Sequence, residues 1–449
     1  MLRSLIVLVT SAGLGLAPAS IPSPTAPATT LVAAASAVAA AVDDTVAADV
    51  TVVDVPLVVV PLADAEAEAE ADAGTARAPE AAGAEPAPTP GPGPTAEPGP
   101  TPAPAESVTS DGPVAADVLV DGDRVVTPAV EVADAQTVGI TWPEGTGGAQ
   151  LAPELRFRAD GGWSEWVALG VADAEPDAGT ADAVRAERGG TDSYWIGDAD
   201  AVQLSFAATR SGGPADISLA LVGSPEADAA PAATGAGDGA VIRNAVRSTG
   251  EATVLAAATR PSIVTRGQWG ARPQVCAPDV AARLSGAVVH HTAGSNAYST
   301  QAQAMQQIRN DQAYHIDARG WCDIGYNFVV DKWGNIYEGR ANSLTQAVIG
   351  VHASGANTGT VGVSMLGNYD TVATTPAMIG AVGRIIGWRL GNYGIDPHGS
   401  GTYPSGLTLP RVIGHRDVTS TACPGRYGYA QLPNIRNIAA ANLGDPPYP

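Results

Sequence analysis

Two apolar segments that end in histidine constrain the fold of this chain most. Residues 286–292 read GAVVHHT and residues 411–425 read RVIGHRDVTSTACPG, so His290 and His415 each follow a run typical of a buried strand. Cys423 follows His415 by eight positions. Two imidazoles and a thiolate are the ligand set of an open zinc site, in which three protein ligands leave the fourth position free. The sequence therefore predicts zinc ligands at His290, His415 and Cys423.

The other histidines and cysteines also favour a single site late in the chain. All six histidines and all three cysteines lie after residue 260, and no CxxC pair supplies a fourth ligand for a closed structural site. Two other chemistries fit the same donors. Cys423 and His415 would suit a cysteine hydrolase, and two His with one Cys would suit copper, although no His or Met follows Cys423.

Residues 261–443 alternate apolar runs with amphipathic stretches, which indicates an α/β domain with helices packed on a central mixed β-sheet. The expected strands are 286–292, 326–330, 335–337, 361–366 and 411–414. The expected helices are 299–318, 376–390 and a short one from Pro433; Pro376 suits a first helical turn. His290 and His415 then stand at strand ends, where sites tend to form. Residues 444–449 remain as a tail.

The start of the chain predicts export. Arg3, an apolar run over residues 5–16 and Ala17-Pro18-Ala19 have the pattern of a secretory signal peptide at 1–19, and the run is too short for a permanent membrane anchor. We therefore expect a protein of the secreted or cell-wall compartment with no stable membrane insertion. Residues 20–111 are rich in Ala, Pro and acidic residues and predict a disordered spacer; within them the Val-rich stretch 50–62 could form a strand with little to pair with.

Short alternating segments over residues 112–223 predict a small all-β accessory domain, a sandwich of strands. Asp160-Gly161-Gly162 has the composition of a hairpin turn. Its aromatic residues could form a sugar-binding row, but we expect most of them in the core. They are Trp142, Phe157, Trp163, Trp166, Trp195 and Phe206. The Ala/Gly-rich stretch 224–260 predicts a linker to the C-terminal domain.

Charge is divided unevenly between the two parts of the chain. The formal net charge is −22; residues 261–449 carry 13 basic and 10 acidic residues, so the balance is +3 there and −25 over residues 1–260. Only the C-terminal part has a surface suited to an anionic polymer. The acidic N-terminal part argues against nucleic acid as a partner. We expect a monomer.

Four sequence blocks resemble the peptidoglycan recognition protein and type-2 N-acetylmuramoyl-L-alanine amidase family. They are HHTAG (290–294), GWCDIGYNFVVDKWGNIYEGR (320–340), GVSMLGNY (362–369) and GHRDVTSTACPG (414–425), in order and at matching spacing over nearly all of 261–443. Residues 112–223 more weakly resemble the β-rich domains that precede amidases in secreted actinobacterial proteins.

The resemblance implies a function and roles for particular residues. The family's zinc ligands fall on His290, His415 and Cys423, and non-catalytic recognition members lack the Cys. Water activated by zinc would hydrolyse the amide between the lactyl group of muramic acid and L-alanine in peptidoglycan. Tyr326 matches the catalytic tyrosine, and Thr421 stands where such amidases contact substrate or transition state. His352 resembles a substrate-binding groove residue; an exposed surface histidine is the competing interpretation.

The remaining candidates have structural interpretations. Three cysteines in an exported chain leave one over if two pair, and because Cys423 is assigned to zinc we predict a disulfide between Cys276 and Cys322. His291 is expected to pack or to support a ligand, since adjacent strand residues point to opposite faces. His315 is expected to be structural.

Two questions stay open at the level of sequence. The same fold could bind peptidoglycan without cutting it, and the complete set of His290, His415, Cys423 and Tyr326 argues for the enzyme. Ala341-Asn342 stands where many family members that prefer diaminopimelate stems carry Gly-Trp. The resemblance therefore does not predict which third stem-peptide residue the protein prefers.

Overall fold

The computed structural model describes residues 29–33, 50–61, 119–121, 124–132, 134–146, 148–207, 216–225, 260–403 and 405–444. The predicted signal peptide 1–19 lies outside the described residues, as do most of the spacer 20–111, most of the linker 224–260 and nearly all of the tail 444–449. None of the described helices is both long enough and apolar enough to cross a membrane.

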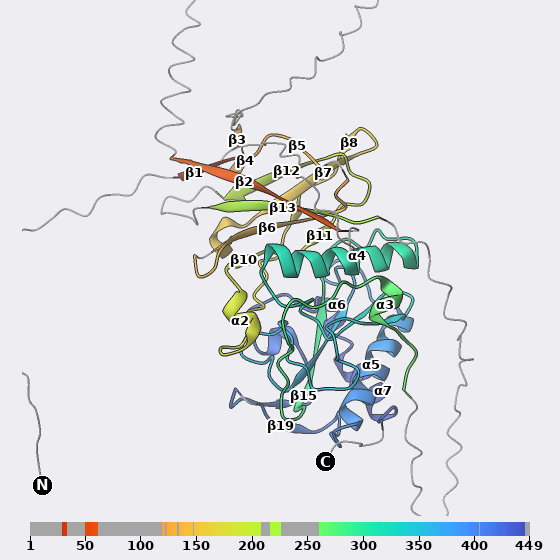
Figure 1. Cartoon of the computed structure of the whole chain (residues 1–449). Coiled ribbons are helices and arrows are strands. Elements are labelled where there is room, and N and C mark those ends of the chain that lie inside the picture. Colours follow the sequence, from red (N-terminus) through yellow and green to blue (C-terminus); the bar gives the residue numbers. More distant parts are fainter. Residues whose placement is uncertain are drawn as a thin grey trace, which may run out of the picture.

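Two antiparallel sheets form the all-β domain that the alternating sequence predicts (Figure 1). The first sheet has the order β1 (Thr29–Ala33), β2 (Thr51–Pro61), β13 (Ile217–Gly223), β6 (Thr137–Pro143) and β10 (Arg188–Gly190), with β11 (Tyr194–Trp195) beside β6. The second has the order β3 (Leu119–Asp121), β4 (Arg124–Val126), β12 (Ala201–Ala207), β7 (Glu154–Ala159) and β8 (Gly162–Trp163), with β5 (Val130–Glu131) on β12 and β9 (Val167–Ala168) on β7.

β2 corrects the assignment of residues 20–111 to a spacer. It pairs antiparallel with β13 over seven residue pairs, and Val55 and Leu57 belong to the sandwich core. The sequence predicts a possible strand at 50–62 that, if isolated, has little to pair with; its partner strand follows much later in the chain. Main-chain hydrogen bonding along the edge of β13 supplies that partner.

The aromatic residues of this domain divide between core and surface. Trp142, Trp195 and Phe206 are buried, whereas Trp163 is 37% exposed. The Arg156 guanidinium lies 5.0 Å from the ring centre of Trp163 and 4.7 Å from that of Trp166. A continuous row of exposed aromatic rings is therefore not present among these six residues.

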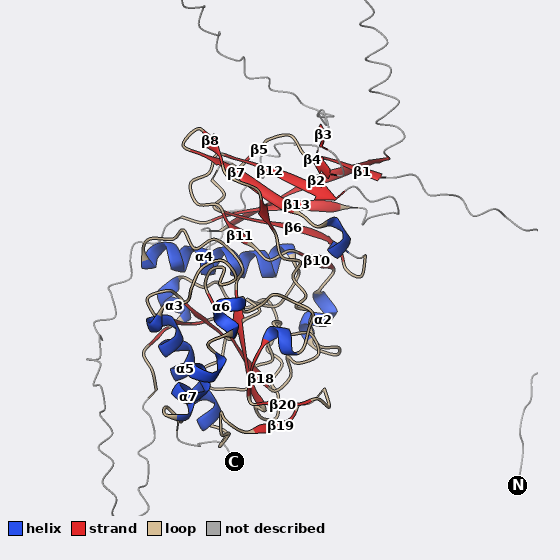
Figure 2. Ribbon diagram, turned by 180° about the vertical axis from the view of Figure 1, so that it is seen from behind, coloured by secondary structure: helices blue, strands red, loops and turns tan. Residues whose placement is uncertain are grey.

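The C-terminal domain is built on the expected mixed sheet. Its order is β14 (Ile263–Val264), β17 (Ile336–Glu338), β16 (Phe328–Val330), β18 (Thr360–Met365), β15 (Gly286–His291) and β21 (Val412–Gly414). All neighbours are parallel except the β16–β17 hairpin. A separate pair, β19 (Ser400–Thr402) and β20 (Thr408–Pro410), lies at the end far from the sandwich (Figure 2).

Helices cover both faces of this sheet. α5 (Pro376–Gly391) and α7 (Leu432–Ala440) pack on one face, against a core that includes Phe328 and Val330. α3 (Arg266–Trp269) and α4 (Gln301–Ala313) pack on the other, where Val329 points. The alternation of Phe328, Val329 and Val330 between the two cores is the period-2 pattern of a strand buried on both sides. Two single-turn helices, η3 (His415–Asp417) and α6 (Arg426–Tyr429), follow β21.

α4 lies between the two domains, with the sandwich above it and the C-terminal sheet below (Figure 1). Eleven of its thirteen residues are buried, many of them polar. Met305 and Ile308 face the C-terminal core. The opposite side forms hydrogen bonds to the sandwich: Asn310 donates to Thr137 Oγ1 at 3.1 Å, and Ser193 donates to Asp311 Oδ1 at 2.5 Å. These bonds satisfy polar groups that would otherwise be costly to bury.

The π-helical turn after α4, η2 (Tyr314–Ala318), places an aromatic ring against the first sheet of the sandwich. Tyr314 Oη donates to the carbonyl oxygen of Thr191 at 2.9 Å. A Cβ atom on Gly139 would lie 2.4 Å from Cε2 of Tyr314, and one on Gly190 would lie 2.8 Å from its Oη. Glycine at these two positions lets the sheet approach the ring, so the two domains are fitted to each other.

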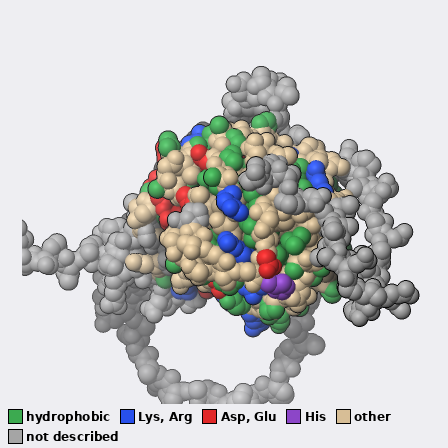
Figure 3. All heavy atoms as spheres, turned by 90° about the horizontal axis from the view of Figure 1, so that it is seen from below, with side chains coloured by type: hydrophobic (Ala, Val, Ile, Leu, Met, Phe, Trp, Pro, Cys, Tyr) green, Lys and Arg blue, Asp and Glu red, His purple; other side chains and the backbone are tan. Residues whose placement is uncertain are grey.

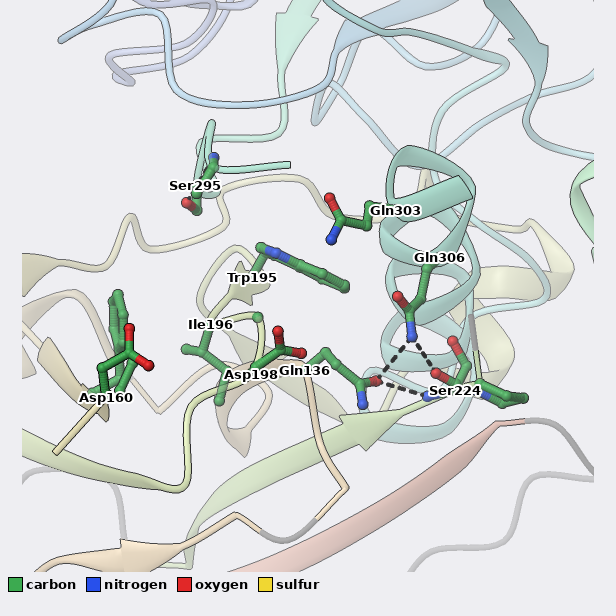
Figure 4. A pocket seen from close by; sticks show the side chains of 14 residues that line it. Gln136, Asp160, Trp195, Ile196, Asp198, Ser224, Ser295, Gln303 and Gln306 are labelled. Carbon is green, nitrogen blue, oxygen red and sulfur yellow. Dashed lines mark hydrogen bonds between the residues drawn. The ribbon is translucent and has the colours of Figure 1, made fainter. Parts of the chain in front are cut away.

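A cavity of about 520 Å³ lies between the sandwich and the start of α4 (Figure 4). Trp195 and Asp198 line it from the sandwich, and Gln303 and Gln306 line it from α4. Gln306 closes one end by donating hydrogen bonds to Gln136 and to the carbonyl oxygen of Ser224. The cavity therefore belongs to the interface between the domains.

Candidate active site

Neighbouring parallel strands bring the two predicted histidine ligands together. β15 and β21 pair with Val289 opposite Gly414, so the next residues, His290 and His415, leave the same edge of the sheet. Their ring centres are 4.7 Å apart. The loop after η3 returns Cys423 to the same place, with its Sγ 3.6 Å from Nδ1 of His290. One ligand atom from each of the three residues lies within 4.8 Å of the others.

The protonation and burial of these groups fit a divalent metal. His290, His415 and Cys423 are 1%, 3% and 9% exposed. Burial, and then the neighbouring imidazoles, hold the pKa of His290 well below its usual value, so the ring is neutral. Nε2 of His415 is buried without a hydrogen-bond partner. Burial raises the pKa of the Cys423 thiol, and a bound cation would supply the charge that stabilises the thiolate. The donor set is the one typical of zinc.

His352 supports His290 from β18's side of the site. Its Nδ1 lies 3.0 Å from Nε2 of His290, which leaves Nδ1 of His290 to face Cys423. His352 is fully buried, so the competing interpretation as an exposed surface histidine is wrong. Asn357 holds this segment in place, because its Oδ1 accepts hydrogen bonds from the main-chain N–H groups of His352 and Ala353.

Tyr326 and Thr421, the two residues predicted to act on substrate, both line the small cavity that His415 and Cys423 also line. The ring centre of Tyr326 is 5.5 Å from that of His290. Desolvation, together with the negative charges of Asp192 and Cys423, holds the pKa of the Tyr326 phenol well above its usual value, so it remains a hydrogen-bond donor. Thr421 Oγ1 accepts a hydrogen bond from the main-chain N–H of Cys423 at 3.2 Å.

The residues with expected structural roles lie outside the donor set. Nδ1 of His291 accepts a hydrogen bond from the main-chain N–H of Tyr369 at 3.0 Å. His315 stacks on Trp321 with ring centres 4.6 Å apart. Cys276 and Cys322 form a disulfide with Cα atoms 5.3 Å apart, and Cys423 is the free cysteine.

Two acidic residues of the site come from the sandwich, and the sequence alone does not predict either of them. Asp173 and Asp192 line the same small cavity as His415 and Cys423. Asp173 belongs to the stretch VADAEPDAG, whose composition matches the linkers of this chain and therefore gives no signal. Desolvation, followed by the charge of Asp173, raises the pKa of Asp192 to about 7. Only the packing of one domain on the other brings these carboxyl groups to the histidines.

Charge on the end of the C-terminal domain far from the sandwich is mixed. Figure 3 shows basic and acidic side chains interspersed among uncharged ones on the described part of that face. This agrees with the near balance of charges after residue 260.

Two family models match the chain. The model described as N-acetylmuramoyl-L-alanine amidase matches residues 281–426, which include all three donor residues. The model described as Rv3811 N-terminal galactose-binding domain-like matches residues 94–237, the part that contains most of the sandwich. A galactose-binding-like all-β domain thus precedes the amidase domain.

Curated relatives match the C-terminal part. The chain is 43% identical to peptidoglycan-recognition protein SC2 of Drosophila simulans over 164 residues, which are 36% of this chain and 80% of the relative. It is 34% identical to peptidoglycan recognition protein 1 of Bos taurus over 189 residues, covering 39% of this chain and 87% of the relative. The solved structure of wild-type Drosophila PGRP-LB aligns with 31% identity and a TM-score of 0.33, over 38% of this chain and 92% of that one. The chain belongs to the peptidoglycan recognition protein and type-2 N-acetylmuramoyl-L-alanine amidase family.

Proposed function

We propose that this protein is a zinc-dependent N-acetylmuramoyl-L-alanine amidase, which hydrolyses the amide between the lactyl group of N-acetylmuramic acid and the L-alanine of the peptidoglycan stem peptide. The observation that carries the proposal is the convergence of His290, His415 and Cys423, with one donor atom of each within 4.8 Å of the others. Membership of the amidase family supports the substrate class.

His290, His415 and Cys423 would hold the zinc ion, and His352 would keep the ring of His290 oriented through the 3.0 Å contact between Nε2 and Nδ1. When bound, zinc supplies Lewis acidity, which polarises the scissile carbonyl and activates water. The Tyr326 phenol donates a hydrogen bond to the oxygen on which negative charge develops. The amide C–N bond breaks, the water oxygen joins the lactyl carbonyl carbon, and its proton goes to the amine of L-alanine.

The alternative within the family is a module that recognises peptidoglycan without cleaving it. Cys423 argues against it, because recognition alone needs neither a buried thiol nor two unprotonated imidazoles facing one another. The cysteine hydrolase, for which His415 was the predicted partner of Cys423, is a chemical alternative; in the structure Nδ1 of His290 lies 3.6 Å from Sγ of Cys423. It differs from the zinc enzyme in one testable respect, which is that it needs no metal.

The full chain incubated with muropeptides tests these functions. We expect new N-terminal alanine, detected by mass spectrometry of the released stem peptide, loss of the reaction on chelation and recovery with zinc. His415→Ala should lose bound zinc and activity together, whereas His398→Ala, at an exposed histidine, should match the wild type. Cleavage that survives chelation would favour the cysteine hydrolase, and binding without cleavage would favour the recognition module.

We also propose that the protein is exported through the signal peptide at 1–19 and acts as a monomer in the cell-wall compartment. The Cys276–Cys322 disulfide supports an oxidising environment. Sequencing the N-terminus of the mature protein should give Ser20, and light scattering should give the mass of one chain. A cytoplasmic protein that retains residues 1–19 would contradict the proposal.

A further inference from the structure

One segment of the sandwich leaves its own domain and lies across the candidate active site. Residues 172–185, here called the strap, connect β9 to β10 and contain the short helix α2 (Ala181–Arg185). Figure 1 shows α2 beside the C-terminal domain rather than beside the sheets of the sandwich. The strap brings Ala172, Asp173 and Ala174 to the wall of the cavity that His415 and Cys423 also line.

Asp173 is a strap residue whose side chain approaches one of the metal donors. Its Oδ1 lies 3.8 Å from Nε2 of His415, the buried nitrogen that has no hydrogen-bond partner. Its Oδ2 accepts a hydrogen bond from Thr419 Oγ1 at 2.9 Å, so the carboxylate is oriented from the far side. The main-chain oxygen of Asp173 accepts a hydrogen bond from Ser354 Oγ. The C-terminal domain therefore holds both the side chain and the backbone of this residue.

The separation of Asp173 and His415 is short enough for both to bind one ion. Zinc–nitrogen and zinc–oxygen bonds of about 2.0–2.2 Å at the tetrahedral angle place two ligand atoms of one zinc about 3.4 Å apart. The 3.8 Å between Oδ1 of Asp173 and Nε2 of His415 is only slightly longer, so a small movement of the carboxylate brings both atoms onto one ion. His290, His415 and Cys423 supply three ligands, so a carboxylate completes the four-coordinate set of a closed site.

The strap also leaves almost no room for a substrate. The cavity in front of the donors has a volume of about 20 Å³, whereas pockets that bind organic ligands have volumes of roughly 300–1,000 Å³. A cavity of this size holds about one water molecule. A muropeptide cannot reach the three donors while the strap lies as it does here.

Several contacts hold the part of the strap after Asp173. Asp177 Oδ2 accepts hydrogen bonds from the main-chain N–H and the hydroxyl of Thr358, at 2.8 and 2.6 Å. Asn357 Nδ2 donates to the carbonyl oxygen of Glu175 at 2.8 Å. Ala178 and Gly179, which follow, are exposed, and Gly179 has a φ of 86°. Beyond this exposed turn, Asp182 forms a buried ion pair with Arg340, with N–O distances of 2.7 and 2.9 Å.

We propose that Asp173 is a fourth metal ligand in the resting protein, and that residues 172–178 act as an intramolecular plug which must leave before substrate can bind. This inference rests on the proposed function, because it takes zinc to be the ion at His290, His415 and Cys423. The Asp182–Arg340 ion pair keeps the far end of the strap attached while the segment before Gly179 moves. The sandwich is then part of the regulation of the hydrolase.

Cobalt tests the coordination separately from catalysis. The full chain is loaded with Co²⁺, whose visible absorption reports the ligand set, and titrated with azide. Asp173→Ala should change the spectrum and should tighten azide binding by roughly tenfold or more, since an intramolecular ligand competes at a millimolar or higher effective concentration. Glu165→Gln, at an exposed acid of the sandwich, is the matched control and should behave as the wild type.

Substrate turnover then tests the plug. The zinc form of Asp173→Ala should cleave muropeptides about tenfold faster than the wild type, because loss of the ligand lowers the population of the closed state. Asp177→Asn should give a smaller increase with a wild-type cobalt spectrum, since it loosens the plug without removing the ligand. Thermal unfolding of each variant establishes that the domains remain folded.

The outcomes separate this inference from the proposed function. An Asp173→Ala protein with the wild-type cobalt spectrum, azide affinity and cleavage rate would overturn the inference. A slower Asp173→Ala enzyme would also overturn it and would make Asp173 a catalytic residue. If no variant cleaves muropeptides although all of them hold metal, the proposed function fails, and the cobalt measurements still decide whether Asp173 is a ligand.

Discussion

At the scale of single residues, the candidate site depends on buried histidines that are kept neutral and oriented. Nε2 of His290 contacts Nδ1 of His352, and both rings are almost completely buried. Burial and the nearby positive groups lower the pKa of His352 to about 3, so it stays neutral at physiological pH. An imidazole fixed in this way presents its other nitrogen to a metal with little reorganisation.

The support that His352 gives to His290 is testable by metal affinity. We expect His352→Asn to bind zinc about 10–100 times more weakly, which is the usual cost of losing a partner behind a metal ligand. Competition with a chromophoric chelator measures this affinity without an activity assay. His398→Asn is the matched control, because His398 is exposed. Equal affinities of the two variants would show that His352 does not position the ligand.

Asp311, on the side of α4 that faces the sandwich, makes stability depend on pH. Desolvation raises its pKa from 3.8 to about 7, and Ser193 donates a hydrogen bond to it. The folded state therefore binds a proton more tightly than the unfolded state. Its contribution to stability is complete below about pH 4 and is lost as the pH rises to about 7. Burial also raises the pKa of Asp192 to about 7, and Asp192 lies near enough to interact with Asp311. Its contribution to stability is likewise lost as the pH rises.

Replacing Asp311 isolates its contribution. As the pH rises from 4 to 7, the wild type should lose about 2–4 kcal/mol of unfolding free energy relative to Asp311→Asn. Urea unfolding at several pH values measures it, with Glu165→Gln as the control for an exposed acid. A difference that does not change with pH would contradict this interpretation.

At the scale of secondary-structure elements, the position of the strap is fixed by a buried ion pair with the C-terminal domain rather than by apolar packing. The side chains of Arg340 and Asp182 are 2% and 4% exposed. Asp182 Oδ1 also accepts a hydrogen bond from the main-chain N–H of Cys322 at 2.8 Å. Few apolar residues are available to hold the strap, so these polar contacts decide where it lies.

Removing Asp182 should therefore be costly. Asp182→Ala leaves a buried guanidinium without its partner, and we expect a loss of about 3–5 kcal/mol in the free energy of unfolding. Limited proteolysis should cut the variant within the strap faster than the wild type. Asp200→Ala, which breaks an exposed pair with Arg158, should change neither measurement appreciably. Similar effects of the two substitutions would count against a special role for the buried pair.

At the scale of the whole molecule, the two domains share α4 and behave as one unit. α4 and the turn after it contact the C-terminal core through Met305 and Ile308, and they contact the sandwich through Tyr314. Neither domain can lose this helix without exposing apolar surface. We therefore expect calorimetry of the wild type to show one cooperative unfolding transition.

Gly139 tests this coupling. In Gly139→Ala the new methyl group would lie 2.4 Å from the ring of Tyr314, and we expect overpacking to cost about 1–3 kcal/mol and to divide the transition in two. Gly162→Ala, whose Cβ would meet nothing nearer than 3.9 Å, is the matched control in the same domain. A single unshifted transition in Gly139→Ala would show that the contact does not join the domains.

Residue patterns were sufficient to predict the elements whose signal is local. Alternating apolar residues predicted the sandwich, and apolar runs separated by amphipathic stretches predicted the mixed sheet. The runs that end in His290 and His415 predicted that both histidines stand at strand ends. The donor set with Cys423 followed from residue chemistry, because few side chains bind zinc. Cys276 and Cys322 remained as the pair available for a disulfide.

Which surfaces meet is seen only in the folded structure. β2 finds its partner in β13, far along the chain, and α4 buries its polar side because a second domain covers it. Asp173 lies in a stretch that reads as a linker, yet domain packing sets it 3.8 Å from His415. The physical reason is that residue patterns record how much of a segment is buried, whereas its partner is chosen by contacts between residues distant in sequence.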